Sequence, residues 1–296
     1  MKKFSLFLVM LFLTKNAFAS VTIVACEAEW ASLAREIVGN KAQVFTIAKA
    51  NENPSDLSVS TDMKKIVRSA DMMFCSGNGI EDKWLSMAIN KAPNLVVLTR
   101  KENLLFAYDY APYKSTASRV HLNPHNITAI AAEFTRRIKI IDGLNEHFYQ
   151  KSYENFLSRW QKSIAIWEKV AQPLSGMRVV IQSEEWKELL NWLNLEVAVK
   201  IPPQATRLDN VKMLEEALRI LKEKPAQAII FSLQEDKKPA LWLSEKSRTR
   251  MVLLPSTVGS AANSADLFQM FSTIINLLLA DCSKVLCPAQ VGILAS

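Results

Sequence analysis

The chain alternates short apolar runs with amphipathic segments, and it does so in two separate series. In the first half, VTIVAC, AQVFTIA, DMMFCSG and NLVVLT are separated by stretches with apolar residues at helical spacing, such as Leu33 and Ile37. In the second half, MRVVIQ, LEVAVKI, QAIIFS and MVLLP alternate with EEWKELLNWL, LDNVKMLEEALRILKE, PALWLSEKS and SADLFQMFSTIINLLLA. Such alternation predicts parallel sheets. We therefore expect an α/β fold of two Rossmann-like lobes, each a mainly parallel four-stranded sheet with helices on both faces.

One long helical segment separates the two series. Phe156, Trp160, Ile164 and Trp167 fall on one of its faces, a spacing that is typical of packed core residues. We expect a stiff linking helix over 142–174, an N-terminal lobe over 20–141 and a C-terminal lobe over 175–296. A binding cleft is expected where the carboxyl ends of the strands of the two lobes face each other.

The first residues have the features of an export signal. Lys2 and Lys3 precede the apolar run Phe4–Leu13, and Ala17-Phe18-Ala19 forms a small-x-small cleavage site. We predict that residues 1–19 are a signal peptide, that the protein is periplasmic, and that it carries no lipid anchor because no cysteine stands at the cleavage point. No later apolar run is long enough to cross a bilayer, so stable membrane insertion is not expected.

Charge and motifs exclude several function classes. The formal net charge is +7 for the whole chain, and losing Lys2, Lys3 and Lys15 with the signal lowers it to about +4. There is no basic block interleaved with aromatic residues, so a nucleic-acid partner is not expected. Glycine-rich phosphate loops and the common hydrolase motifs are also absent, which argues against an enzyme.

Four cysteines remain in a chain that is expected to reach an oxidising compartment. Cys282 and Cys287 close the short loop CSKVLC, and we predict that they form a local disulfide. Cys26 and Cys75 end two strands that are expected to be neighbours, so their thiols would meet at the floor of the cleft. A disulfide, a thiolate pair for zinc or copper(I), and two buried free thiols are all open for this second pair.

Four local patterns, in the same order along the chain, resemble the periplasmic solute-binding proteins of zinc and manganese ABC uptake systems (the ZnuA/TroA-like family). NPSDLSVSTDMKKIVRSADMMFCSGNGIEDKWL is similar to the family's D-P-H-x-Y-x-P segment and the residues that follow it. RVHLNPHN, VVIQSEEW and MVLLPSTVGS are similar to its H-x-W-L-D-P-x-N, V-V-x-x-H-D-A-W and V-x-x-L-D-P-L-G. The resemblance covers essentially the whole mature chain and implies the same two-lobed fold with a linking backbone helix.

The resemblance also implies a binding site, but the residues at its positions are unusual. The family's four metal ligands fall on Ser55, Arg119, Ser183 and Leu254. Zinc in proteins is held by thiolate, imidazole or carboxylate groups, and Leu254 offers none of these. A guanidinium at Arg119 would repel a divalent cation. Direct metal binding at the usual site is therefore not expected, although the family implies zinc or manganese as cargo.

Other residues near the expected cleft are further candidates. His121 is either a displaced ligand on the same strand face as Arg119 or a packed replacement for the family's tryptophan. Glu27, like Glu29, stands on the cleft side of a strand-to-helix turn, where acids are also ordinary residues of a helix N-terminus.

Arg119 suggests two further hypotheses. With Ser55 and Ser183 it forms a set that suits a carboxylate or phosphate. Alternatively, Arg119 and Glu184 form an ion pair that spans the cleft and imitates the clamp of a metal.

The expected function follows from the resemblance. It is that of a monomeric periplasmic solute-binding protein of a zinc- or manganese-type ABC uptake system, which captures cargo between the lobes and delivers it to an inner-membrane permease. The alternative is a relative that binds no metal and acts as an accessory protein-interaction module or a small-anion binder.

Overall fold

The structure, a computed structural model, describes residues 20–89, 102–116, 119–204 and 208–280. Its N-terminal half contains one parallel sheet with strand order β2-β1-β3-β4, and its C-terminal half a second with order β6-β5-β7-β8. Every strand pair in both sheets is parallel. The expected α/β fold with two four-stranded parallel sheets is therefore confirmed.

The elements follow one another as the alternating pattern predicts. The N-terminal half contains β1 (Val21–Ala25), α1 (Ala28–Val38), β2 (Ala42–Thr46), α2 (Thr61–Arg68), β3 (Met72–Cys75), α3 (Leu85–Ile89), β4 (Leu104–Phe106), α4 (Ala107–Tyr110) and α5 (Pro124–Ile141). After α6 (Glu146–Ala171), the C-terminal half contains β5 (Arg178–Ile181), α7 (Lys187–Leu193), β6 (Glu196–Lys200), α8 (Leu208–Glu223), β7 (Ala228–Phe231), α9 (Lys237–Ser247), β8 (Met251–Leu253) and α10 (Leu267–Leu279).

The fourth strand of the first sheet differs from the prediction. We expected it at NLVVLT, which lies outside the described residues. The structure places β4 at Leu104–Phe106, paired with β3 through Met73 and Leu104. A three-residue strand is too short to show a period, so only its pairing with β3 reveals it.

Both sheets bury their two faces. In β1, Ile23 and Ala25 face one apolar cluster, and Val24 faces another beneath α2 and α3. In β5, Val179 and Ile181 likewise face away from Val180. Because side chains alternate along a strand, a continuous apolar run supplies both faces at once.

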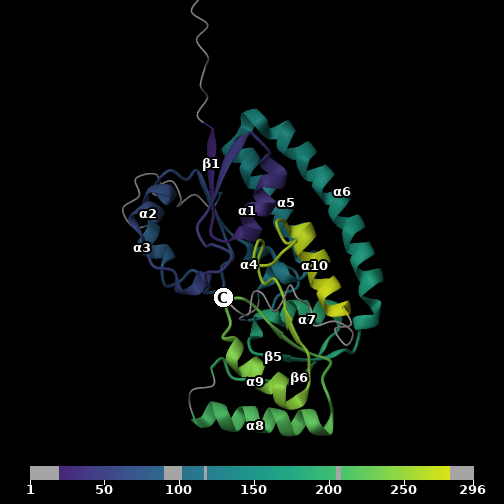
Figure 1. Cartoon of the computed structure of the whole chain (residues 1–296). Coiled ribbons are helices and arrows are strands. Elements are labelled where there is room, and N and C mark those ends of the chain that lie inside the picture. The colour runs from purple at the N-terminus through teal and green to yellow at the C-terminus, as the bar shows by residue number, and fades with distance from the viewer. Residues whose placement is uncertain (1–19, 90–101, 117–118, 205–207, 281–296) are drawn as a thin grey trace, which may run out of the picture.

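The long helix α6 runs along one side of both lobes (Figure 1). Its predicted apolar face is buried: Phe156 and Trp160 are fully covered, and Ile164 and Trp167 nearly so. Helix α10 packs against α6 and α1, and Trp160 and Trp167 contact Phe268 and Phe271. One apolar cluster therefore includes residues of both lobes, so separating the lobes would expose core surface.

No helix within the described parts of the chain combines the length and the hydrophobicity that crossing a membrane requires. The predicted signal peptide (1–19) and the predicted Cys282–Cys287 disulfide lie outside the described residues.

Candidate functional site

A polar pocket of about 630 Å³ lies between the two lobes. The N-terminal lobe contributes Asn53, Asp56 and Arg119, and the C-terminal lobe contributes the remaining lining residues. Five carboxylates line the pocket against two basic groups. The carboxylates are Asp56, Glu184, Glu185, Glu235 and Asp236, and the bases are Arg119 and Lys200. The charge balance of the pocket is therefore acidic.

Arg119 crosses the pocket to reach an acid of the other lobe. Its Nε donates to Oε2 of Glu185 at 2.7 Å, and its backbone N–H donates to the Glu185 carbonyl at 3.3 Å. The two side chains are 9% and 13% exposed. Although burial opposes the charge, Glu185 and Glu29 raise the pKa of Arg119 above its usual value. The structure supports the hypothesis of an ion pair between the lobes, but the acid that pairs with Arg119 is Glu185 and not the predicted Glu184.

Glu184, the partner that we expected, points elsewhere. Its Oε1 accepts from Lys200 Nζ at 2.9 Å within the same lobe. Both acids lie in the 3-10 turn η6 (Glu184–Trp186), where Ser183 Oγ accepts from the Glu185 N–H at 3.1 Å. Consecutive residues of such a turn point in different directions, so Glu185 alone faces Arg119. The sequence SEEW contains both acids but does not indicate which one faces inward.

A second buried contact between the lobes runs through Glu29 and His121. Oε1 of Glu29 lies 3.0 Å from Nδ1 of His121, and the Nε2 of this ring donates to the Ser256 carbonyl at 2.8 Å. The Thr257 hydroxyl donates to Oε2 of Glu29. Glu29 is fully buried, which alone would raise its pKa, but His121, Arg119 and Thr257 lower that pKa to about 2. Glu29 is therefore a buried carboxylate that contacts groups of both lobes.

His121 is thus a packed side chain that serves as a bridge. It is 1% exposed and meets the edge of Trp30. It lies in a 3-10 turn, η3 (Val120–Leu122), and not in a strand, so our argument from strand alternation with Arg119 was wrong. The sequence did not reveal that Glu29, Ser256 and Thr257 would converge on it.

The other family ligand positions are placed as follows. Ser183 lines the pocket as the cap of η6. Ser55 is half-buried in the turn η1 (Pro54–Asp56), and its neighbours Asn53 and Asp56 line the pocket while it does not. Leu254 is 1% exposed and belongs to the apolar cluster that the lobes share. The four positions therefore bring together no set of metal-ligating atoms.

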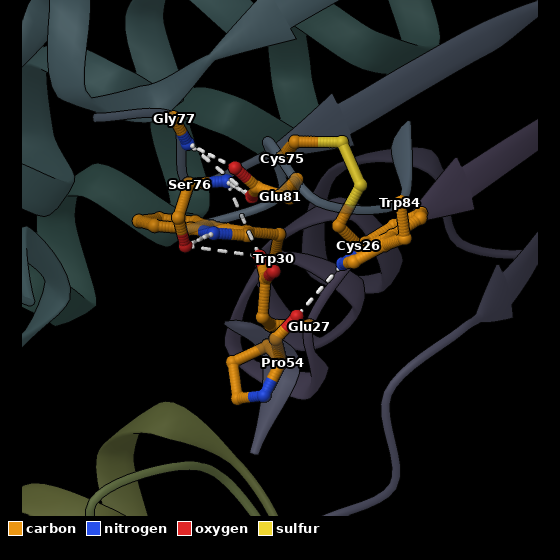
Figure 2. The surroundings of a disulfide bond; sticks show 9 residues. All are labelled: Cys26, Glu27, Trp30, Pro54, Cys75, Ser76, Gly77, Glu81 and Trp84. Carbon is orange, nitrogen blue, oxygen red and sulfur yellow. Dashed lines mark hydrogen bonds between the residues drawn. A yellow bond between two sulfur atoms is a disulfide. The ribbon is translucent and has the colours of Figure 1, made fainter. Parts of the chain in front are cut away.

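Cys26 and Cys75 form a disulfide, with their Cα atoms 4.7 Å apart (Figure 2). Cys26 directly follows β1, and Cys75 is the last residue of the neighbouring strand β3. Of the three alternatives that the sequence left open, the structure has the disulfide. The pair lies beneath η1, because Trp84 Nε1 beside it donates to the Pro54 carbonyl at 2.7 Å.

Two buried carboxyl groups lie next to this disulfide. Glu81 accepts from the N–H groups of Ser76, at 2.6 Å, and Gly77, at 2.9 Å. Glu27 accepts from the Ser76 hydroxyl at 2.9 Å and also meets the Glu81 carboxyl. Burial, together with the charges of Glu81 and Glu29, raises the pKa of Glu27 well above its usual value. Glu27, a predicted cleft residue, is thus held under the cleft and not in the pocket lining.

Glu235 lines the pocket and titrates near neutrality. Burial, followed by the charge of Glu185, raises the pKa of Glu235 to about 7. Between pH 4.5 and 7, Glu235 is therefore protonated in the folded protein but ionised in the unfolded chain. The free energy of unfolding should therefore fall by about 2–3 kcal/mol as the pH rises through this window.

Replacing Glu235 by glutamine should remove this part of the pH dependence. Urea unfolding at pH 5 and pH 7.5 measures it, with Glu216→Gln on the exposed face of α8 as the matched control. Equal pH dependence in Glu235→Gln and the wild type would show that Glu235 titrates normally.

Comparison with known proteins identifies the fold and the family. A family model described as zinc-uptake complex component A, periplasmic (ZnuA), matches residues 23–280. A cadmium-bound periplasmic metal-binding protein from Candidatus Liberibacter asiaticus is 12% identical, with a TM-score of 0.71, over 87% of this chain and 98% of that one.

A solved ZnuA structure is 17% identical, with a TM-score of 0.70, over 87% of this chain and 98% of its own. A ZnuA deletion mutant with zinc bound is 16% identical, with a TM-score of 0.70, over 88% and 99%. At these identities the solved structures show a shared fold. A search of curated protein sequences found no match.

Proposed function

Since this chain belongs to the family of periplasmic zinc-uptake components (ZnuA), we propose that it is the periplasmic binding component of a metal-ion uptake system. The family's proteins are solute-binding components and not enzymes. We propose that the mature chain works as a monomer, that residues 1–19 direct its export, and that it delivers its cargo to an ABC permease of the inner membrane.

The acidic lining of the inter-lobe pocket is the observation that supports a cation as the cargo. Five carboxylates from both lobes outnumber Arg119 and Lys200, and these two bases are already paired with Glu185 and Glu184. A pocket of this charge attracts cations and repels carboxylates and phosphates. This favours a metal cargo over the alternative of a small-anion binder.

The residue types favour a hard cation. The pocket lining offers carboxylate, amide and hydroxyl oxygens, with no imidazole and no thiolate among its residues. Oxygen ligands of this kind suit manganese better than zinc. We propose manganese as the preferred cargo of the pocket, at the carboxylates of Glu235 and its neighbours and not at Ser55, Arg119, Ser183 and Leu254.

Two contacts hold the lobes together, as a metal bound between the lobes would. The Arg119–Glu185 pair and the Glu29–His121–Ser256 chain connect the lobes with buried charges. We propose that these contacts keep the lobes together before cargo arrives, so that binding involves little closure. The shared apolar cluster supports the same conclusion.

Calorimetry on chelator-treated, oxidised protein tests this function. We expect about one equivalent of manganese to bind, with weaker binding of zinc and no heat from phosphate. Binding should strengthen as the pH rises through 7, because the cation competes with the proton on Glu235. Glu235→Gln should weaken manganese binding at least tenfold, and the exposed control Glu216→Gln should not.

Two outcomes would contradict the proposal. Phosphate binding in the absence of metal would favour the anion binder. The absence of any manganese or zinc binding would favour an accessory module without cargo.

A further inference from the structure

The disulfide and its neighbours form a group of potential ligands outside the inter-lobe pocket. The Sγ atoms of Cys26 and Cys75 and a carboxylate oxygen of Glu81 lie within 4.8 Å of one another. All three residues are buried, the cysteines completely. Among the residues that the structure describes, this is the only group of three or more histidine, cysteine, aspartate or glutamate side chains placed so that they could hold one metal ion. Figure 2 shows the three converging at the ends of β1 and β3.

A fourth group faces the same place and is incompletely satisfied. Glu27 is 2% exposed, and its carboxyl meets that of Glu81. Its Oε2 accepts from Ser76, no donor group among the described residues reaches its Oε1, and its carboxyl lies at hydrogen-bond distance from that of Glu81. Two buried carboxyls in such contact are costly unless a proton or a cation lies between them. The position of Glu27 thus points to a ligand independently of the cysteines.

We propose that Cys26, Cys75, Glu81 and Glu27 form a second cation site that opens when the disulfide is reduced. The site goes beyond the inter-lobe pocket and does not depend on the cargo proposed there. Two thiolates with two carboxylates are a donor set for a thiophilic divalent cation, with zinc as the physiological candidate. In the oxidised protein the sulfurs are bonded to each other, and the carboxyls alone do not complete the set.

The redox step requires an external dithiol. One of its thiolates attacks one sulfur of the Cys26–Cys75 bond, which forms a mixed disulfide and releases the other cysteine as a thiolate. The second thiol of the reductant then displaces the remaining cysteine and leaves as a cyclic disulfide. Two electrons pass to the protein, and the two protons of the dithiol are released to solvent as the cation binds both thiolates.

The surroundings suit a dry, preformed site. Trp30 Nε1 donates to the Ser76 hydroxyl, which in turn donates to Glu27. The backbone N–H groups of Ser76 and Gly77 fix Glu81. Because these partners do not use the sulfur atoms, they orient the carboxylates in both redox states. Such supporting contacts hold ligands in position for a metal.

Cobalt(II) provides a direct probe, because its thiolate complexes absorb by sulfur-to-metal charge transfer. The experiment uses Cys282→Ser/Cys287→Ser protein, so that Cys26 and Cys75 are the only thiols. The protein is reduced with dithiothreitol, freed of it by anaerobic gel filtration, and titrated with cobalt. We expect one equivalent to bind with charge-transfer absorption, zinc to displace it, and the oxidised protein to show no such absorption.

Variants test whether Glu81 binds the cation or only supports the fold. Glu81→Gln, in the same background, should bind cobalt at least tenfold more weakly while its circular dichroism spectrum stays unchanged. Glu235→Gln in the inter-lobe pocket should leave the absorption unchanged, which separates this site from the cargo pocket. The proposal is overturned if reduced protein gives no charge-transfer band, or if Glu81→Gln binds cobalt as tightly as its parent.

Discussion

Replacing Arg119 by methionine should lower the free energy of unfolding by about 3–5 kcal/mol, because the change leaves a buried carboxylate without its counter-charge. Among the described side chains, Glu185, its partner at 2.7 Å, would then accept a hydrogen bond from the Ser232 hydroxyl alone, at 3.2 Å. Glu29 would also lose a positive neighbour. Equilibrium unfolding in urea at pH 7 measures the loss.

Removing both members of the pair is the informative control. Arg119→Met/Glu185→Leu eliminates the uncompensated charge, so much of the lost stability should return. Arg219→Met, on the exposed face of α8, breaks ion pairs that water already screens and should have little effect. If Arg119→Met behaves like Arg219→Met, the pair does not stabilise the contact between the lobes.

Removing the Cys26–Cys75 disulfide should cost about 4 kcal/mol in the chain-entropy model, because the bond closes a long loop in the unfolded chain. The two cysteines are 49 residues apart, and the loop includes β2, α2 and the turn with Ser55. Cys26→Ala/Cys75→Ala preserves the small apolar character of both positions. Urea unfolding of the double variant and of the oxidised wild type gives the difference.

Reduction of the disulfide measures the same loss of stability in a second way. Dithiothreitol should destabilise the wild type by an amount similar to that of the double substitution. It should affect the double variant only through Cys282 and Cys287, which Cys282→Ser/Cys287→Ser removes. A double variant as stable as the oxidised wild type would show that the loop is constrained by its packing and not by the bond.

These two expectations concern different parts of the molecule. The Arg119–Glu185 pair joins the lobes, whereas the disulfide joins the carboxyl ends of the two central strands, β1 and β3, under the turn that carries Ser55.

The sequence determined the architecture because periodicity is a local property. Continuous apolar runs of strand length and the aromatic stripe from Phe156 to Trp167 each report how a segment buries its own side chains. The resemblance found in four motifs also led to the correct family. The pattern missed β4, because a strand of three residues becomes visible only through its hydrogen bonds to β3.

The site depended on contacts that no local pattern records. Nothing in SEEW separates Glu185 from Glu184, and the turn capped by Ser183 decided which acid faces Arg119. Nothing around Cys26 indicated that Glu81 would lie beside it. Side-chain spacing within a segment is fixed by backbone geometry. The meeting of charges from distant segments is fixed by how the lobes and their turns pack, and tertiary structure alone determines that packing.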